Sequence, residues 1–213
     1  MRGDVPATRL LLVRHGQTDD NANQVFQGQK GRGLNAVGRA QAARLAERVA
    51  RLSVDVLITS DLERAAETAR IVGARIGLEP TLDRALREVD VGAWTGLTYA
   101  EAALRFPEEW AAWTAGLDVP RGGGETYAAL AARIGARVRA LAEEHAGRTV
   151  LAVSHGAALR SFVATLLGLA AQGPRALAGL QNTSITTIGA DGGILRLVAF
   201  NDAAHLEDGE PWR

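Results

Sequence analysis

Residues 11–16 read LLVRHG, and residues 151–156 read LAVSHG. Each stretch is a short apolar run, typical of a buried strand, that ends in a polar residue followed by His-Gly. Ligands of open α/β sheets bind at the carboxyl ends of the strands. We therefore expect His15 and His155 to lie at one edge of the same sheet. The two stretches predict both the class of fold and the place of a functional site.

Strand and helix patterns alternate along the rest of the chain. Apolar runs predict strands over 9–13, 54–59, 81–82, 149–154, 184–188 and 194–200, the last two around a turn at 191–193. Helical spacing of apolar residues predicts helices over 34–52, 60–76, 98–105, 127–141 and 157–167. Asn35 is placed to cap the first helix, and SDLE at 60–63 is a capping-box pattern that would open the second. This order predicts an α/β fold, a three-layer sandwich with a mainly parallel central sheet flanked by helices.

Bulk composition is that of an ordinary globular chain. Its 213 residues favour a single domain over 1–213, in which residues 88–124 form a small irregular or helical, cap-like segment. Basic and acidic residues both number 24, so the charge gives no sign of nucleic-acid binding. Cysteine is absent, which excludes disulfides, thiolate chemistry and cysteine-bound zinc. The sequence has neither a signal-peptide core nor a run as long as a membrane helix, so we expect a cytoplasmic protein without a membrane partner.

Four side chains are expected to meet where the strands end. Arg14 and His15 follow the first strand, and His155 follows a later one. Arg64 lies in the first turn of the helix after the second strand. Guanidinium groups, imidazoles and helix N-termini together favour binding of phosphate. Taken singly, each of these residues also fits a structural or solvated position, and Glu88 alone would be an ordinary surface acid, so it is the joint pattern that indicates chemistry.

Six motifs follow one another along the chain. They are RHGQT (14–18) followed by Asn21, QG (27–28) followed by Leu34 and Gly38, SDLERAAETA (60–69), LRE (86–88) followed by Gly92, Trp94 and Gly96, GGE (123–125), and SHG (154–156). In order and spacing they resemble the histidine phosphatase superfamily, also called phosphoglycerate-mutase-like, over nearly the whole chain. One departure affects the outer wall of the pocket: Gly31 and Arg32 stand where many relatives carry an aspartate.

The resemblance implies a role for each matching residue. His15 would attack phosphorus and carry the phosphoryl group, and Glu88 would protonate the leaving alcohol and then take a proton from water. Arg14, Arg64 and His155 would hold the equatorial oxygens. The implied substrate-binding positions are Gly16, Thr18, Asn21, Gln27 and Gly28. No metal and no cofactor are implied, and Asp90 and Glu125 are the next candidates for the proton donor.

The segment after Glu88 separates the two main activities of the family. VDVGAWTG at 89–96 resembles the phosphatase branch, whereas mutases typically carry an Arg-His-Tyr-Gly-like segment there. Lys30 is the only lysine, and the sequence shows no cationic insertion for a second phosphate. We therefore expect a metal-independent phosphatase that hydrolyses small phosphomonoesters, of the sugar phosphate or phosphoglycerate type, through a phosphohistidine. Mutase-type phosphoryl transfer is the alternative, and a non-catalytic protein that binds a phosphorylated ligand is a third reading.

Three tryptophans lie in the cap-like segment. We expect Trp94, Trp110 and Trp113 to pack a small core there, with the alternative that one of them lines the substrate pocket. The expected partner is a small phosphorylated metabolite, and a homodimer is compatible with the sequence.

Overall fold

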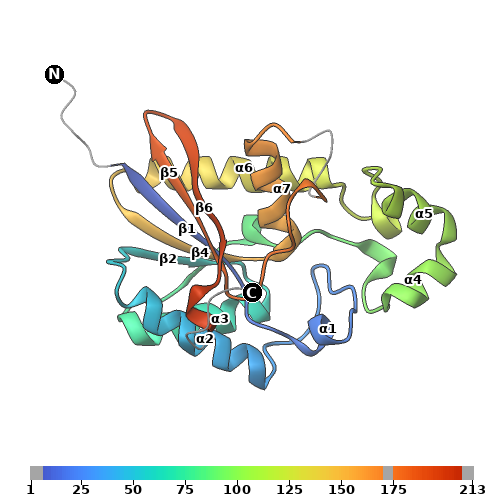
Figure 1. Cartoon of the computed structure of the whole chain (residues 1–213), viewed down its shortest axis with the longest axis horizontal. Coiled ribbons are helices and arrows are strands. Elements are labelled where there is room, and N and C mark those ends of the chain that lie inside the picture. Colours follow the sequence, from blue (N-terminus) through green and yellow to red (C-terminus); the bar gives the residue numbers. More distant parts are fainter. Residues whose placement is uncertain (1–6, 170–174, 208–213) are drawn as a thin grey trace.

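A central sheet of six strands carries the fold (Figure 1). The computed structural model describes residues 7–169 and 175–207. The strands are β1 (Thr8–Arg14), β2 (Val56–Thr59), β3 (Thr81–Leu82), β4 (Thr149–Ser154), β5 (Ile185–Asp191) and β6 (Ile194–Asp202). Their order is β3-β2-β4-β1-β5-β6, in which the first four are parallel, β5 is antiparallel to β1, and β6 is antiparallel to β5. The predicted α/β fold with a mainly parallel sheet is confirmed.

Helices cover both faces of this sheet. Helices α2 (Ala36–Val49) and α3 (Glu63–Ile76) pack on one face, and α6 (Tyr127–Glu144) and α7 (Gly156–Leu166) pack on the other (Figure 1). In β1, Leu10 and Leu12 join the core with α6 and α7, whereas Leu11 and Val13 join the core with α2 and α3. All four side chains are fully buried. A strand that is buried on both faces has apolar residues at successive positions. This is why apolar and polar residues do not alternate along β1.

The helix starts follow the predicted caps with one exception. Asn35 accepts a hydrogen bond from the Gly38 N–H, as expected of a cap. The capping box predicted at 60–63 is wrong, because α3 begins at Glu63 with Leu62 as its N-cap and no side-chain cap. The Ser60 hydroxyl instead accepts from the Leu62 N–H and contacts the His155 ring. Ser60 lies at the end of β2, where its neighbour is a site histidine and not the first turn of the helix.

The segment 88–124 is more helical than its glycines and prolines indicate. It contains the 3₁₀ turns Gly92–Trp94 and Arg121–Gly123, α4 (Tyr99–Arg105) and α5 (Pro107–Ala115), the last of which we did not predict. A further single turn, α1 (Asp19–Ala22), lies in the glycine-rich loop after β1. Trp94 is fully buried, with ring centroids 5.8 Å from Trp110 and 5.9 Å from Trp113. The tryptophans pack a small aromatic core, as expected.

The last two strands form the predicted hairpin, turning at Gly192 and Gly193, both with positive φ. A turn with two left-handed residues matches the twist of antiparallel strands, and glycine adopts it without steric cost. After β6, the 3₁₀ turn Ala204–Leu206 contacts α2. Within residues 7–169 and 175–207, no helix is both long enough and apolar enough to span a bilayer.

Candidate active site

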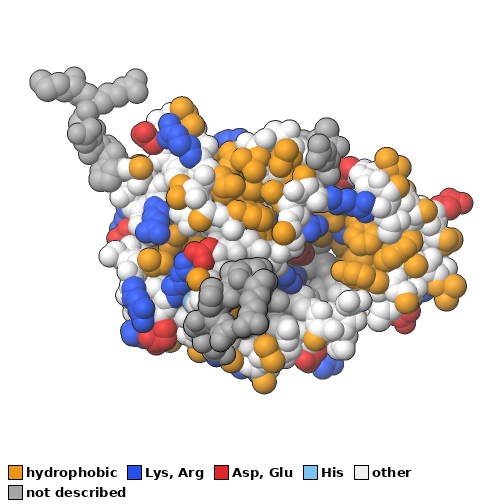
Figure 2. Space-filling model, viewed as in Figure 1, with side chains coloured by type: hydrophobic (Ala, Val, Ile, Leu, Met, Phe, Trp, Pro, Cys, Tyr) orange, Lys and Arg blue, Asp and Glu red, His pale blue; other side chains and the backbone are white. Residues whose placement is uncertain are grey.

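A cavity of about 260 Å³ opens at the carboxyl ends of β1 and β4, between the sheet and the segment that carries α4 and α5. Figure 2 shows the surface hollowed between these two parts of the molecule. The wall of this cavity includes the predicted site residues Arg14, His15, Asn21, Gln27, Gly28, Arg64 and Glu88. It also includes Tyr99, Trp113, Arg121, Tyr127 and Arg160. Another cavity, of about 320 Å³, lies near Thr8 and Arg139 at the opposite end of the strands and contains none of the predicted site residues. The candidate active site is therefore the cavity of about 260 Å³ that contains His15.

His15 is held as a neutral imidazole with one unprotonated nitrogen. Its Nδ1 lies 2.7 Å from the Gly16 carbonyl oxygen, to which it can only donate. Its Nε2 accepts a hydrogen bond from Arg64 Nε at 3.2 Å, so the lone pair is on Nε2. Burial, and then the charges of Arg64 and Arg14, hold the pKa of His15 well below its ordinary value of 6.5. At neutral pH the ring therefore keeps the lone pair that a nucleophile needs.

Arg64 is anchored by the loop that faces it. Its Nη1 donates to the Lys30 carbonyl at 2.7 Å, and its Nη2 donates to the Gly28 carbonyl at 2.8 Å. Burial lowers the pKa of Arg64 to about 10, with Glu88 opposing the shift, so the side chain is still a cation at neutral pH. Arg14 donates from Nη1 to the Leu180 carbonyl, and burial lowers its pKa as well. A buried guanidinium group, that of Arg64, and a half-buried one, that of Arg14, thus lie beside the His15 ring.

His155 packs against His15 behind the cavity wall. The two ring centroids are 5.1 Å apart, and His155 is fully buried. Its Nε2 lies 2.8 Å from the Ser60 hydroxyl oxygen, while its Nδ1 has no partner within the part of the chain that is described. Donation of the Ser60 hydroxyl proton to Nε2 would leave the ring proton on Nδ1, which no described group accepts. Burial, and then the charge of Arg64, hold the pKa of His155 well below its ordinary value.

The Glu88 carboxylate lies at the N-terminus of α7. Its Oε1 accepts from the N–H groups of Val89 and Ala158, each at 2.9 Å, and its Oε2 accepts from the Ala157 N–H at 3.1 Å. Of the acidic side chains in the described ranges, Glu88 alone lines the cavity. Asp90 is exposed and accepts from the Gly92 N–H, so it is not placed to act there.

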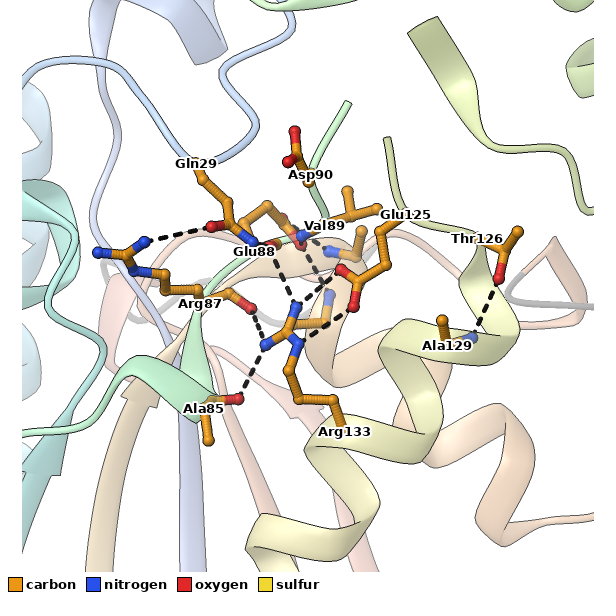
Figure 3. Close-up of polar contacts among 12 residues, drawn as sticks. Gln29, Ala85, Arg87, Glu88, Val89, Asp90, Glu125, Thr126, Ala129 and Arg133 are labelled. Carbon is orange, nitrogen blue, oxygen red and sulfur yellow. Dashed lines mark hydrogen bonds and ion pairs between the residues drawn. The ribbon is translucent and has the colours of Figure 1, made fainter. Parts of the chain in front are cut away.

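Arg133 on α6 fixes the backbone that carries Glu88 (Figure 3). It donates to the carbonyl oxygens of Ala85, Arg87 and Glu88 at 2.9, 2.9 and 3.3 Å. Its ion pair with Glu125, 2.8 Å from Nη2 to Oε2, directs the guanidinium toward these carbonyls. Glu125, a second candidate for the proton donor, is therefore the partner of Arg133 and does not line the cavity. Nothing in the helical pattern of 127–141 singles out Arg133.

The predicted substrate-binding positions divide into two groups. Asn21, Gln27 and Gly28 line the cavity. Gly16 and Thr18 do not line it: the Gly16 N–H donates to Thr68, and Thr18 caps α1. These two residues shape the loop after β1, from which Asn21 and Gln27 reach the cavity.

Several residues at the site carry no motif in the sequence. Asn182 donates from Nδ2 to the His15 carbonyl at 2.9 Å and contacts the Asn21 side chain at 3.4 Å. The next residue, Thr183, donates its N–H to the Arg14 carbonyl at 2.8 Å from a left-handed conformation. Arg121 and Arg160 add two cations to the wall, although the sequence shows no cationic insertion. Among the described residues, no group of three or more His, Cys, Asp or Glu is arranged to hold a metal ion.

Comparisons with known proteins identify the family of this chain. The family model described as histidine phosphatase superfamily (branch 1) matches residues 10–203. Phosphoglycerate mutase-like protein 4 of Arabidopsis thaliana is 36% identical over 211 residues, 96% of this chain and 90% of that protein. Glucosyl-3-phosphoglycerate phosphatase of Mycobacterium tuberculosis is 36% identical over 190 residues, 85% of each chain. The solved structure of a mycobacterial glucosyl-3-phosphoglycerate phosphatase with VO3 has a TM-score of 0.82, is 33% identical, and covers 91% of this chain and 99% of that one.

Proposed function

The chain belongs to the histidine phosphatase superfamily, branch 1, and from this premise we propose that it hydrolyses small phosphomonoesters through a phosphohistidine on His15. The observation that carries the proposal is the Nε2 lone pair of a buried, neutral His15, which faces a cavity with buried arginines and one acid on its wall. A cavity of about 260 Å³ suits a small phosphorylated metabolite.

The reaction has two steps at phosphorus. First, His15 Nε2 attacks phosphorus, the bond from phosphorus to the ester oxygen breaks, and protonated Glu88 gives its proton to the departing alkoxide. Second, a water attacks the phosphohistidine, Glu88 takes the proton from that water, and the bond between Nε2 and phosphorus breaks. Inorganic phosphate leaves, and both side chains return to their starting forms.

The cations hold the phosphoryl oxygens while negative charge develops on them. We assign this role to Arg14 and Arg64, because both line the wall beside His15, with Arg64 buried and Arg14 half-buried. We add His155 as a further donor, because its ring packs on His15 behind the wall and its Nδ1 has no partner in the described part of the chain. Fixed donors in a buried site stabilise such charge more strongly than water does. Cations and imidazole N–H groups thus supply the positive charge that stabilises the phosphoryl oxygens, and we propose that no metal ion is needed.

Mutase-type transfer is the second candidate, and one observation keeps it open. Arg121 and Arg160 supply positive charge beyond that of Arg14 and Arg64, and a second anionic group is a requirement of phosphoglycerate mutation. The relative named phosphoglycerate mutase-like protein 4 fits either activity. The two activities differ in product: a phosphatase releases inorganic phosphate, whereas a mutase moves the group to another oxygen of the substrate.

A product assay tests the proposal. Purified protein is incubated with a panel of phosphorylated metabolites and with 4-nitrophenyl phosphate, and both free phosphate and positional isomers are measured. We expect phosphate release, unchanged by excess chelator and absent from His15→Ala. Isomer formation without phosphate release would establish the mutase alternative, and binding without turnover would establish a non-catalytic binding protein. Loss of activity in chelator, restored by magnesium or zinc, would contradict metal independence.

A further inference from the structure

A threonine beside the catalytic loop has a backbone conformation that its residue type rarely adopts. Thr183 has a φ of 61° and is fully buried. A branched Cβ disfavours this left-handed region, so contacts with the surrounding structure must hold the residue there. The Thr183 N–H donates to the carbonyl oxygens of Arg14 and His15, at 2.8 and 3.3 Å. Thr183 thus extends the pairing of β5 with β1, in which Val13 lies opposite Ile185, as far as the proposed nucleophile.

Asn182 holds the same stretch of backbone through its side chain. Its Nδ2 donates to the His15 carbonyl at 2.9 Å. The His15 ring is in turn oriented by its own loop, because Nδ1 donates to the Gly16 carbonyl. A displacement of residues 182–183 would therefore move the carbonyl groups of Arg14 and His15 and, with them, the nucleophilic ring.

The Thr183 side chain connects this backbone to His205. Its Oγ1 donates to the Asn182 carbonyl at 2.7 Å and lies 3.1 Å from Nε2 of His205. The carbonyl can only accept, so it takes the hydroxyl proton, and Nε2 of His205 must donate to Oγ1. His205 lies in the 3₁₀ turn Ala204–Leu206, which follows β6 and contacts α2.

The other ring nitrogen of His205 faces a cation on α2. Its Nδ1 lies 3.3 Å from Nη1 of Arg48, which can only donate, so Nδ1 carries the lone pair. Arg48 is itself paired with Asp202 through both terminal nitrogens. Burial, and then the charge of Arg48, lower the pKa of His205 to about 4, while Asp202 opposes this shift and Arg44 adds to it. At neutral pH the ring is therefore neutral, with its proton on Nε2, as both contacts require.

We propose that His205 is a positioning residue for the nucleophile: its Nε2–H holds Thr183, and Thr183 holds the backbone of Arg14 and His15. The inference rests on the proposed phosphohistidine on His15, and it goes further by giving catalysis a second histidine that lies outside the cavity. Neither His205 nor Thr183 lines the cavity wall. Their loss should therefore slow phosphoryl transfer to His15 without removing a group that binds the substrate.

Single-turnover kinetics of two variants test the inference. His205→Leu removes both ring nitrogens, and Thr183→Val replaces the hydroxyl group by a methyl group of similar size. With 4-nitrophenyl phosphate, we expect the limiting rate constant of nitrophenolate release to fall by about tenfold to a hundredfold in each variant, the cost of a displaced catalytic group. His205→Gln should keep most of the wild-type rate constant, because its amide can donate to Thr183 and accept from Arg48. The limiting rate constant at saturating enzyme does not depend on the folded fraction of the sample.

A double variant shows whether His205 acts through Thr183. In that case the protein with both His205→Leu and Thr183→Val should be no slower than the slower single variant. The matched control is His145→Leu, because His145 follows α6 at the end of the sheet away from the cavity, and this variant should keep the wild-type rate constant. A wild-type rate constant in His205→Leu, or losses that multiply in the double variant, would overturn the inference and leave the phosphatase proposal intact.

A measurement on the wild-type protein decides the matter even if the variants do not fold. Nitrogen NMR spectra of protein with isotope-labelled histidine, assigned through the backbone, report the protonation of each ring. At pH 7 we expect His205 to be neutral, with its proton on Nε2. A ring protonated on Nδ1, alone or together with Nε2, would overturn the inference. Absence of nitrophenolate release from the wild-type protein would overturn the proposed function and this inference with it.

Discussion

Arg64 donates from Nε to Nε2 of His15 across 3.2 Å, so the nitrogen assigned as the nucleophile is hydrogen-bonded to one of the cations assigned to the phosphoryl group. The lone pair that accepts this bond is the one that must attack phosphorus. Arg64 therefore has to exchange His15 for a phosphoryl oxygen when substrate enters. Its other two nitrogens keep their carbonyl partners at Lys30 and Gly28 during this exchange.

Arg64→Lys tests this arrangement. A lysine keeps the charge but has no planar group that can reach His15, Gly28 and Lys30 at once. We expect kcat to fall by about 10²–10³-fold, the cost of one lost donor to the developing charge. The control is Arg70→Lys on the same helix, where Arg70 is exposed and pairs with Glu63. Equal kcat values for the two variants would mean that Arg64 does not contact the reacting group.

The pH profile follows from the low pKa of His15. Protonation of His15 removes the lone pair, so activity falls as the pH drops through the pKa of this ring. Burial and the neighbouring arginines place that pKa well below 6.5, so activity should persist from pH 7 down past pH 6.5. The measurement is kcat/KM for 4-nitrophenyl phosphate against pH, corrected for ionisation of the substrate. An acid limb with its midpoint at or above 6.5 would contradict a neutral, buried His15.

Glu88→Gln separates a proton donor from a structural carboxylate. An alkoxide leaving group needs a proton, whereas a nitrophenolate departs without one. We expect single-turnover hydrolysis of an alkyl phosphate to slow by about 10²–10⁴-fold, and the phosphorylation step with 4-nitrophenyl phosphate to slow far less. Glutamine keeps one oxygen acceptor for the Ala158 N–H, and its amide group replaces the oxygen that now accepts from the Ala157 N–H. Equal losses on both substrates would mean that Glu88 only positions the site.

Gly38→Ala tests the packing of the catalytic loop on α2. A Cβ at Gly38 would lie 2.0 Å from the Gln17 carbonyl oxygen, and a Cβ at Gly16 would lie 2.6 Å from the Gly38 carbonyl oxygen. The clash is with backbone, so the loop after His15 must move. We expect a loss of about 1–3 kcal/mol in the free energy of unfolding and a lower kcat.

The matched control is Gly135→Ala within α6. There the added methyl group meets the end of the flexible Arg139 side chain at 3.3 Å, and alanine is the better helix former. This variant should be as stable as the wild type or more stable. A thermal melt compares the three proteins, and a Gly38→Ala variant that matches the wild type in melting temperature and kcat would refute the close-packing argument.

The sheet and the main site residues could be predicted because their signals are local. The runs that become β1 and β4 are apolar and end in His-Gly, and parallel neighbours then bring His15 beside His155. The helical pattern of 127–141 also appears as α6, with Thr126 as its cap. In these cases short-range patterning and tertiary packing agree.

Other features depend on contacts between distant segments and could not be predicted. The sequence pattern at 60–63 predicts that Ser60 belongs to a capping box, but its hydroxyl lies against His155, 95 residues later. Asn182 follows no periodic pattern, and it reaches His15 only because β5 pairs with β1. Arg121 stands before a run of glycines, and its place on the cavity wall depends on the packing of Gly92 against Gly122.

The central claim is a phosphohistidine on His15, and trapping it is the most direct measurement. Wild-type protein is mixed with 4-nitrophenyl phosphate, quenched in base within one turnover, digested and analysed by mass spectrometry. We predict one phosphoryl group on the peptide that contains His15, stable in base, lost in acid and absent from His15→Ala. An adduct on a different residue, or hydrolysis by His15→Ala at a rate near that of the wild type, would contradict the account.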